Sequence, residues 1–188
     1  MDDEVWAKII LLEKKRQTGK AYIKTPVFSI DGSDVGFDGD VVGVNGIKSG
    51  DGDKESAMCK LLIEEGCRLK LTQSGDILIK RDDNLNIFVK QPKQGNSSSL
   101  GDQLVKLPYG LLPQYKTHKL FDMKKFQQIL STELLNDCPD WISLGNQAVS
   151  IFSFAKFSDD ILSAPVWVVI VNIVALHILK TMKESEFR

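Results

Sequence analysis

The sequence predicts an α+β fold with a β-sandwich core and helices gathered at one end. Short β-rich runs come first along the chain, and helical patterns mixed with two more strand patterns follow them. The clearest region has three apolar runs, Cys67–Leu71, Ile77–Ile79 and Ile87–Val89, which polar turns separate. Turn residues between short β-rich runs are typical of an antiparallel meander. Because this meander carries no reactive group, it favours a binding module over an enzyme.

Length and charge limit the classes of protein to which this chain can belong. Its 188 residues are enough for one well-cored domain, which we predict to span residues 1–188. Hydrophobic residues make up 43% and charged residues 26%, which is ordinary for globular proteins. The formal net charge of -1 gives no strong field to gather nucleic acid, so direct binding of DNA or RNA is not expected.

Three candidate strands precede the meander. Residues 5–12 (VWAKIILL) form a short apolar run, which periodicity alone assigns neither to a helix nor to a strand. Ala21–Ile30 alternates as a strand does. Pro26 within it indicates an edge position or a bulge, because proline has no N–H to donate to a ladder. A third, short strand is predicted at Val41–Val44.

A helix is predicted between the third candidate strand and the meander. Asp53 is a suitable N-cap residue, and Gly66 is a plausible residue for the stop that follows the helix. The residues that follow Asp53 at helical spacing are Ala57, Met58, Leu61, Leu62 and Glu65.

After the meander the chain alternates between polar segments and further helices and strands. Gln94–Gly101 is predicted to be a flexible surface loop without core-forming residues. Lys116–Leu120 is short and strand-like, and Asp122 is expected to cap a helix. Pro139 and Trp141 are expected to open another short helical turn or helix. The apolar face of the helix after Asp122 is predicted to comprise Met123, Phe126, Ile129, Leu130 and Leu134.

The C-terminal part contains two more strand patterns and one segment that resembles a membrane span. Ala148–Phe157 alternates through Val149, Ile151 and Phe154, as a strand does. The apolar segment 161–179 is shorter than the ~20 residues that a spanning helix needs, and Pro165 interrupts it. We predict instead a strand at Val166–Val171, buried on both faces. Asn172 is then expected to start a helix with Ile173, Leu176, Leu179 and Met182 at helical spacing.

The cysteines indicate neither a metal site nor a redox pair. Cys59, Cys67 and Cys138 are odd in number and widely spaced, and no C-x-x-C occurs. We therefore expect no metal and no cofactor, and three buried or half-buried thiols in a reducing compartment. The N-terminal sequence MDDEVW is acidic where a secretory signal peptide would be basic.

No set of residues indicates catalysis. His118 lies in the charged segment KTHKL, and His177 is expected on the polar face of the last helix. No G-x-S-x-G motif accompanies either histidine. The segment Asp31–Gly36 resembles a calcium loop, but it fails at Val35, and Val42 stands where a bidentate Glu is needed.

One charged loop is a candidate for contacts with a partner. Lys156, Phe157, Asp159 and Asp160 lie between two apolar strand patterns. Loops that rigid strands hold in place commonly carry binding residues. The alternative is an ordinary polar turn in which Phe157 points inward.

Six segments carry a family resemblance. In order along the chain they are EKKRQTGKAYIKTPVFSIDG, IEEGCRLKL, NIFVKQP, KTHKLFDMKKFQQIL, AVSIFSFAKF and SAPVWVVIVNIVALHILKTM. These segments resemble, in the same order, segments of the C-terminal Mad-homology-two domain of Smad proteins. The collinear resemblance covers about residues 5–183, and it has the order of elements that the residues predict by themselves.

The resemblance implies a fold and a class of function. The implied fold is a Smad/FHA-like antiparallel β-sandwich with a loop-helix region at one end and a helical bundle at the other, in which residues 5–12 form a strand. The implied function is a non-enzymatic protein-interaction domain without cofactors. Its expected partners are other proteins, and neither nucleic acid nor a membrane. The expected location is the cytoplasm, with the nucleus as the alternative.

Several residues depart from the Smad pattern. Smads end in a serine motif that receptors phosphorylate, whereas this chain has Ser185 alone. The counterpart of their basic phosphoserine-binding loop is Lys156–Ile161, which is shorter and acidic. Asp31 matches an aspartate that helps to form the Smad trimer, but Asp40 and Val41 stand nearest to the position of its arginine partner. We therefore expect a diverged, non-Smad member without phosphoserine recognition, which is a monomer or a weak oligomer and contacts partners through Asp31 and the acidic loop.

Two other functions stay open at this point. The alternative is a signal transducer of the transforming-growth-factor-β type that binds Smads or receptors, and a lower alternative is a hydrolase. Recovery of receptor kinases and Smads with this protein would favour the former. Turnover that depends on His118 or His177 would favour the latter.

Overall fold

A computed structural model of the chain describes residues 4–48 and 53–186. Within these residues it has ten strands, five α-helices and two short 3-10 turns. The strands are β1 (Ala7–Glu13), β2 (Arg16–Ile23), β3 (Val27–Asp31), β4 (Val41–Gly43), β5 (Cys67–Leu71), β6 (Ile77–Arg81), β7 (Ile87–Val89), β8 (Thr117–Phe121), β9 (Val149–Phe154) and β10 (Trp167–Asn172). The helices are α1 (Lys54–Leu62), α2 (Asp102–Val105), α3 (Met123–Glu133), α4 (Trp141–Gln147) and α5 (Ile173–Glu186), and the 3-10 turns are η1 (Pro108–Gly110) and η2 (Ile161–Ser163).

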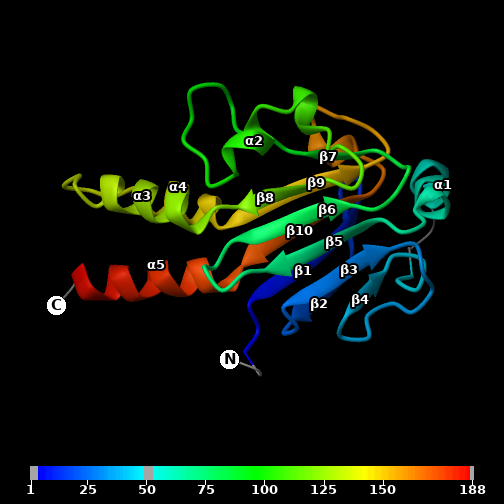
Figure 1. Cartoon of the computed structure of the whole chain (residues 1–188), viewed down its shortest axis with the longest axis horizontal. Coiled ribbons are helices and arrows are strands. Elements are labelled where there is room, and N and C mark those ends of the chain that lie inside the picture. The colour runs from blue at the N-terminus through cyan, green and yellow to red at the C-terminus, as the bar shows by residue number, and fades with distance from the viewer. Residues whose placement is uncertain (1–3, 49–52, 187–188) are drawn as a thin grey trace.

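The strands form two five-stranded sheets, which make up a β-sandwich (Figure 1). The first sheet has the strand order β2-β1-β10-β9-β7, and the second has the order β4-β3-β5-β6-β8. Neighbouring strands are antiparallel except β3 and β4, which run parallel. Side chains of both sheets, including Ile9 and Leu69, belong to one buried cluster. The predicted sandwich is confirmed, and most of the ambiguous run 5–12 belongs to strand β1.

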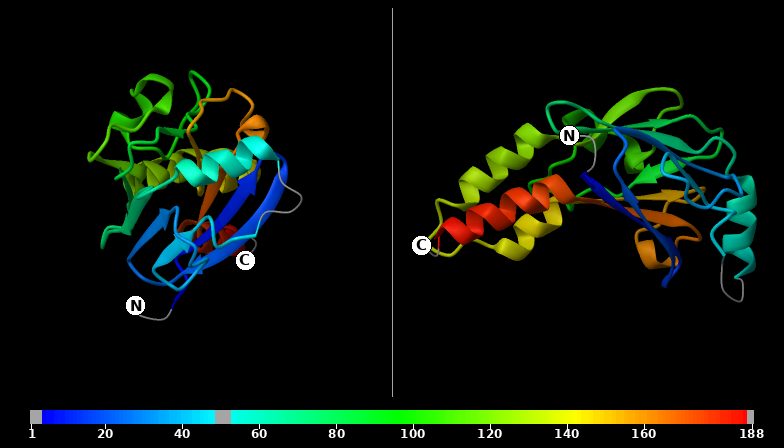
Figure 2. Two further views of the ribbon diagram at one scale, coloured as in Figure 1. Left: turned by 90° about the vertical axis from the view of Figure 1, so that its right-hand side faces the viewer. Right: turned by 90° about the horizontal axis from the view of Figure 1, so that it is seen from below.

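Helices lie at both ends of this sandwich. α1 covers one end, where Asn45 of the loop after β4 donates through its side chain to the Lys60 carbonyl at 3.2 Å. At the opposite end, α3, α4 and α5 extend away from the sheets as a bundle (Figures 1 and 2). The Lys183 ammonium of α5 lies 5.7 Å from the ring centre of Trp141 on α4. The loop-helix region and the helical bundle are therefore where the resemblance puts them.

The predicted meander is wrong in its third strand. β5 and β6 form an antiparallel hairpin, but β7 pairs with β9 in the other sheet, and β8 occupies the outer edge of β6. The turn before β7 is held by Asp83, whose carboxylate accepts the N–H groups of Glu64, Gly66 and Leu85 at 2.8, 2.9 and 3.0 Å. These bonds fix the chain where β6 ends beside the start of β5, and the chain then crosses to the first sheet.

The single strand predicted at Ala21–Ile30 is two strands in different sheets. β2 ends at Ile23 and β3 begins at Val27, so Pro26 lies in the crossing between the sheets and not within a strand. The crossing is bonded on both sides: the Trp6 indole donates to the Thr25 carbonyl at 2.7 Å, and the Leu71 N–H donates to the Pro26 carbonyl at 2.8 Å.

The starts of α1, α3 and α5 follow the sequence closely, because a local side chain caps each of these helices. Asp53, Asp122 and Asn172 accept the N–H groups of Ser56, Lys125 and Ala175 respectively. The predicted stop at Gly66 is wrong, since α1 ends at Leu62. Gly66 has φ +58 and lies against the Ile30 carbonyl, where a side chain would not fit.

Strand β9 lies within its predicted run, β8 is displaced by one residue from the predicted Lys116–Leu120, and β10 fits its prediction in part. β10 is flanked by β1 and β9, and Trp167, Val168 and Ile170 are buried. Val169 and Val171 are half-buried, so burial on both faces is wrong for these two residues. In the described part of the chain, no helix has the length and apolar character that crossing a membrane requires.

Candidate functional site

The predicted partner loop is an ordered turn between β9 and β10 at the α1 end of the sandwich (Figure 1). It starts at Ala155, whose φ of +68 turns the chain out of β9. Asp160 caps η2 by accepting the Leu162 N–H at 3.1 Å. The hydroxyls of Ser158 and Ser163 donate to the Asp160 carbonyl at 2.6 and 2.8 Å. Local bonds therefore set the shape of this loop.

Phe157 belongs to a small aromatic cluster at the protein surface. Its ring centre lies 5.1 Å from that of Tyr109 and 6.0 Å from that of Phe88. Phe157 stays 40% exposed and Tyr109 68% exposed. The alternative of a Phe157 side chain tucked inward does not describe this geometry, because the ring packs beside an exposed tyrosine.

The charges next to this loop are largely paired. Lys156 Nζ lies 3.8 Å from Glu55 Oε1 of α1. Lys14 Nζ, in the β1–β2 turn, lies 2.9 Å from Asp53 Oδ1 and 3.1 Å from Glu55 Oε2. Hydrogen bonds to Asp53 and Glu55 raise the pKa of Lys14, and the bond from Lys14 lowers the pKa of Asp53. The ammonium groups here thus face carboxylates of the same chain.

Of the predicted contact residues, four lie together and one does not. Lys156, Phe157, Asp159 and Asp160 share the β9–β10 loop, and both aspartates are exposed. Asp31 lies at the end of β3 in the second sheet, is half-buried, and accepts the Ser33 N–H at 3.0 Å. Its carboxylate therefore holds the turn that follows β3.

Sequence reasoning missed an exposed apolar ridge on α1, formed by Met58, Leu61 and Leu62. These side chains are 58%, 70% and 53% exposed, although helical spacing of apolar residues usually marks a buried face. The face of α1 that packs on the sandwich is instead Ser56, Cys59 and Lys60. Spacing in the sequence does not decide between the two faces, because Ser56, Cys59 and Lys60 have the same helical spacing as the ridge.

The remaining reactive side chains form no metal-binding cluster in the described chain. Among residues 4–48 and 53–186, no cluster of three or more His, Cys, Asp or Glu could hold a metal ion. Burial raises the pKa of Cys59 to about 12 and raises that of Cys67 as well, so both thiols are poor nucleophiles. The expectation of three buried or half-buried thiols is wrong for Cys138, which is exposed.

His118 is expected to make stability depend on pH. It lies on β8 and is 9% exposed, and neither ring nitrogen has a hydrogen-bond partner among the described residues. Burial, and next the charge of Lys116, lower the pKa of His118 below the ordinary 6.5. The unfolded chain then takes up a proton that the folded chain resists. The free energy of unfolding should therefore be fully kept above pH 6.5. It should fall as the pH drops from 6.5 toward the lower pKa of the folded state.

Urea unfolding at about pH 7.5 and about pH 5.5 measures this effect, because carboxylates of ordinary pKa titrate below that window. His118→Leu should flatten the change of unfolding free energy between the two conditions. The exposed His177 provides the control, and His177→Gln should keep the wild-type change. An undiminished pH dependence in His118→Leu would show that this histidine is not its source.

The sequence matches the family model described as "MH2 domain" over residues 4–173. No curated protein sequence matches the chain significantly.

Solved structures share the fold at low sequence identity. The crystal structure of the Interferon Regulatory Factor 9 IAD domain superposes with a TM-score of 0.62 and 15% identity, covering 96% of this chain and 89% of that chain. A chain from the crystal structure of STAT2 in complex with IRF9 gives a TM-score of 0.66 and 14% identity, covering 95% of this chain and 98% of that chain. These similarities, together with the two sheets and their helical ends, show a Smad/FHA-like β-sandwich.

Proposed function

Because this chain belongs to the MH2 domain family, we propose that it is a non-catalytic protein–protein interaction domain. The family and its structural neighbours support protein binding, and one neighbour comes from a complex of two proteins, STAT2 and IRF9. The observation that carries the proposal for this chain is the ridge of Met58, Leu61 and Leu62 on α1.

The ridge has the chemistry of an interface centre. Three adjacent apolar side chains are exposed, and full burial of one such side chain is worth ~1.5–3 kcal/mol. Lys54 and Glu55 of the same helix are exposed and lie one turn before Met58. An apolar centre with a polar rim is the usual anatomy of a protein interface.

Substitution of the ridge is expected to abolish partner binding without unfolding the domain. Leu61→Gln together with Leu62→Gln removes the apolar centre, and exposed positions usually change stability by less than about 0.5 kcal/mol each. Proximity labelling in source cells should then lose the proteins that the wild-type chain enriches. Leu135→Gln, at an 85% exposed position beyond α3, is the matched control and should keep them. An unchanged set of labelled proteins in the α1 variant would contradict the proposal.

We further propose that phosphoserine recognition has been lost. A doubly charged phosphate needs several converging Lys or Arg donors. Here Lys156 lies beside Glu55, and Asp159 and Asp160 follow it in the loop. Lys14 is within 3.1 Å of two carboxylates. A phosphate at this surface would therefore meet more repulsion than attraction, and phosphorylation of Ser185 would not drive self-association.

Calorimetry with a phosphorylated Smad-type tail peptide is expected to give no measurable heat of binding. Lys156→Ala should leave that result unchanged. A basic peptide is the expected binder at Asp159 and Asp160, so it provides the second arm of the measurement. Micromolar binding of the phosphopeptide that Lys156→Ala removes would instead support the signal-transducer alternative.

Other properties of the domain belong to the same proposal. Residues 1–188 act as a single domain that binds proteins, and not nucleic acid or a membrane, in the cytoplasm or the nucleus. The domain is a monomer or a weak oligomer, because Asp31 bonds to its own chain at Ser33 and no arginine stands near Asp40 and Val41 in the sequence. Sedimentation at micromolar concentration reports the oligomeric state directly.

A further inference from the structure

A polar cavity of about 640 Å³ lies between the start of β9, the segment 90–100 and α4. Pockets that bind ligands commonly have volumes of ~300–1,000 Å³. The segment 90–100 is fixed as its wall, because the Ser99 N–H and hydroxyl both donate to Gln147 Oε1 of α4, at 2.9 and 3.0 Å. Leu100 anchors the end of this segment in the core, so the expectation of a loop without core-forming residues is wrong there.

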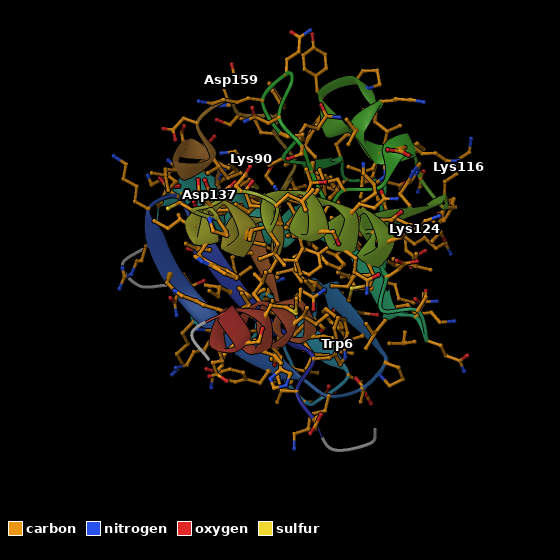
Figure 3. The ribbon with its side chains drawn as sticks, turned by 90° about the vertical axis from the view of Figure 1, so that its left-hand side faces the viewer. Trp6, Lys90, Lys116, Lys124, Asp137 and Asp159 are labelled. Atoms are coloured by element: carbon orange, nitrogen blue, oxygen red, sulfur yellow. The ribbon has the colours of Figure 1, made fainter. Side chains whose placement is uncertain are left out.

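The cavity is lined by one cation and several uncharged polar groups. Lys90 is exposed, and no carboxylate side chain lines the cavity beside it. In the described part of the chain, the side chains of Lys90, Asn96, Ser97 and Asn146 form no hydrogen bond or ion pair. These groups are therefore available to a ligand. Figure 3 looks onto the helical end of the molecule and labels Lys90.

β9 leaves part of its backbone edge open inside this cavity. β7 pairs with β9 only at Phe152–Phe154, and the Lys90 N–H adds a 2.8 Å bond to the Ile151 carbonyl. The next donor in this register would be Pro92, facing Val149, and proline has no N–H. The ladder between β7 and β9 therefore stops before Val149, which lines the cavity.

The direction of the Val149 backbone follows from its neighbours. On the β10 side, bonds run from the Phe154 N–H to the Val166 carbonyl and from the Asn172 N–H to the Ala148 carbonyl. Alternate residues of an antiparallel strand point their backbone groups to the same side. Even-numbered residues of β9 thus face β10, and the N–H and C=O of Val149 face the cavity.

A smaller cavity of about 240 Å³ is lined by part of the same segment and by α3. Its lysine, Lys125, already donates to the Leu100 carbonyl at 2.7 Å and to Asp102 Oδ1 at 2.8 Å. These bonds hold the segment 90–100 against α3 and leave Lys90 as the available cation.

We propose that the larger cavity binds an extended peptide segment with an acidic side chain, contributed by a partner protein. An extended peptide presents an N–H and a C=O at the spacing of a strand, so it can continue the ladder at Val149. A carboxylate beside that position meets Lys90 without an opposing acid. This inference rests on the proposed function, because it adds a second docking site to the same interaction domain.

Nuclear magnetic resonance on the isotope-labelled full chain tests the site without knowledge of the partner. Two pools of acetylated, amidated pentapeptides are compared, one with Asp and the other with Lys at the central position, and with the other positions randomised. The Asp pool is expected to shift the amide signals of Val149, Ser150 and Ile151, and the Lys pool is expected to leave them in place. No shift at millimolar Asp pool, or equal shifts from both pools, would overturn the inference.

Two lysines of the same segment provide matched variants. Lys90→Ala should weaken binding of the Asp pool about fivefold, as expected for a partly exposed ion pair. Lys93→Ala, at an exposed position that does not line the cavity, should keep the wild-type affinity. Equal losses in the two variants would mean a general charge effect and would reject the site. Suppose that neither peptide pool shifts these amide signals, while the α1 substitutions still abolish partner labelling. In that case this inference is wrong and the proposed function stands.

Discussion

Trp167→Ala is expected to destabilise the domain by ~3–5 kcal/mol, which is a large part of the ~5–15 kcal/mol that stabilises a typical domain. Trp167 begins β10, the middle strand of the first sheet, and is 5% exposed. Its indole N–H donates to the Lys14 carbonyl at 2.8 Å. Truncation leaves a cavity at this buried site, which lies outside the main hydrophobic cluster, and removes this donor, so urea or thermal denaturation should show unfolding or a much lower midpoint.

A second tryptophan is the control for this experiment. Trp141 on α4 is half-buried and packs under Lys183, so Trp141→Ala should cost clearly less than Trp167→Ala. Trp167→Phe keeps most of the apolar volume, so its loss of stability should lie between those of the other two variants. An unchanged melting temperature for Trp167→Ala would show that β10 is not where the structure has it.

The second large effect is expected at the buried ion pair between α1 and β1. Lys60 is 5% exposed, and its Nζ lies 3.1 Å from Glu13 Oε1 and donates to the Ile47 carbonyl at 2.9 Å. Lys60→Met leaves the Glu13 carboxylate buried without this cation. Removal of one member of a buried pair typically costs ~3–5 kcal/mol, and urea denaturation measures the loss.

A double variant tests whether the loss of stability comes from the ion pair or from damage to helix α1. Glu13→Leu combined with Lys60→Met removes both charges and should recover much of the stability that Lys60→Met loses. Lys54→Met, at an exposed position of the same helix, should have little effect. If the two single losses simply add in the double variant, the two side chains are not coupled and this account of α1 is wrong.

Elements that depend on neighbours in the sequence were predictable, whereas their partners across the sheets were not. Asp122 caps α3 because its carboxylate reaches an N–H three residues away. β7 follows β6 in the sequence but pairs with β9, more than 60 residues later, because β8 already covers the edge of β6. The choice between these partners lies in long-range packing, which local turn patterns do not contain.

The candidate site shows the same limit. The loop Lys156–Ile161 could be found from its charges and its place between two strands. The orientation of α1 could not be found in this way, because Leu61 and Lys60 belong to competing faces with equal helical spacing. The polar face is buried since Lys60 meets Glu13, which lies 47 positions earlier in the chain. This contact leaves the apolar ridge of α1 in solvent, and we propose that partner proteins bind there.

The first strand, β1, pairs with the last strand, β10, in the first sheet. Ala7 of β1 pairs with Asn172 of β10, and β10 separates β1 from β9. During synthesis, β1 leaves the ribosome long before its inner partner exists. The first sheet can close only after residues 167–172 have emerged, so it forms after all its other strands have been synthesised. A chain that stops before β10 carries two open strand edges, at β1 and β9, which invite pairing with other chains.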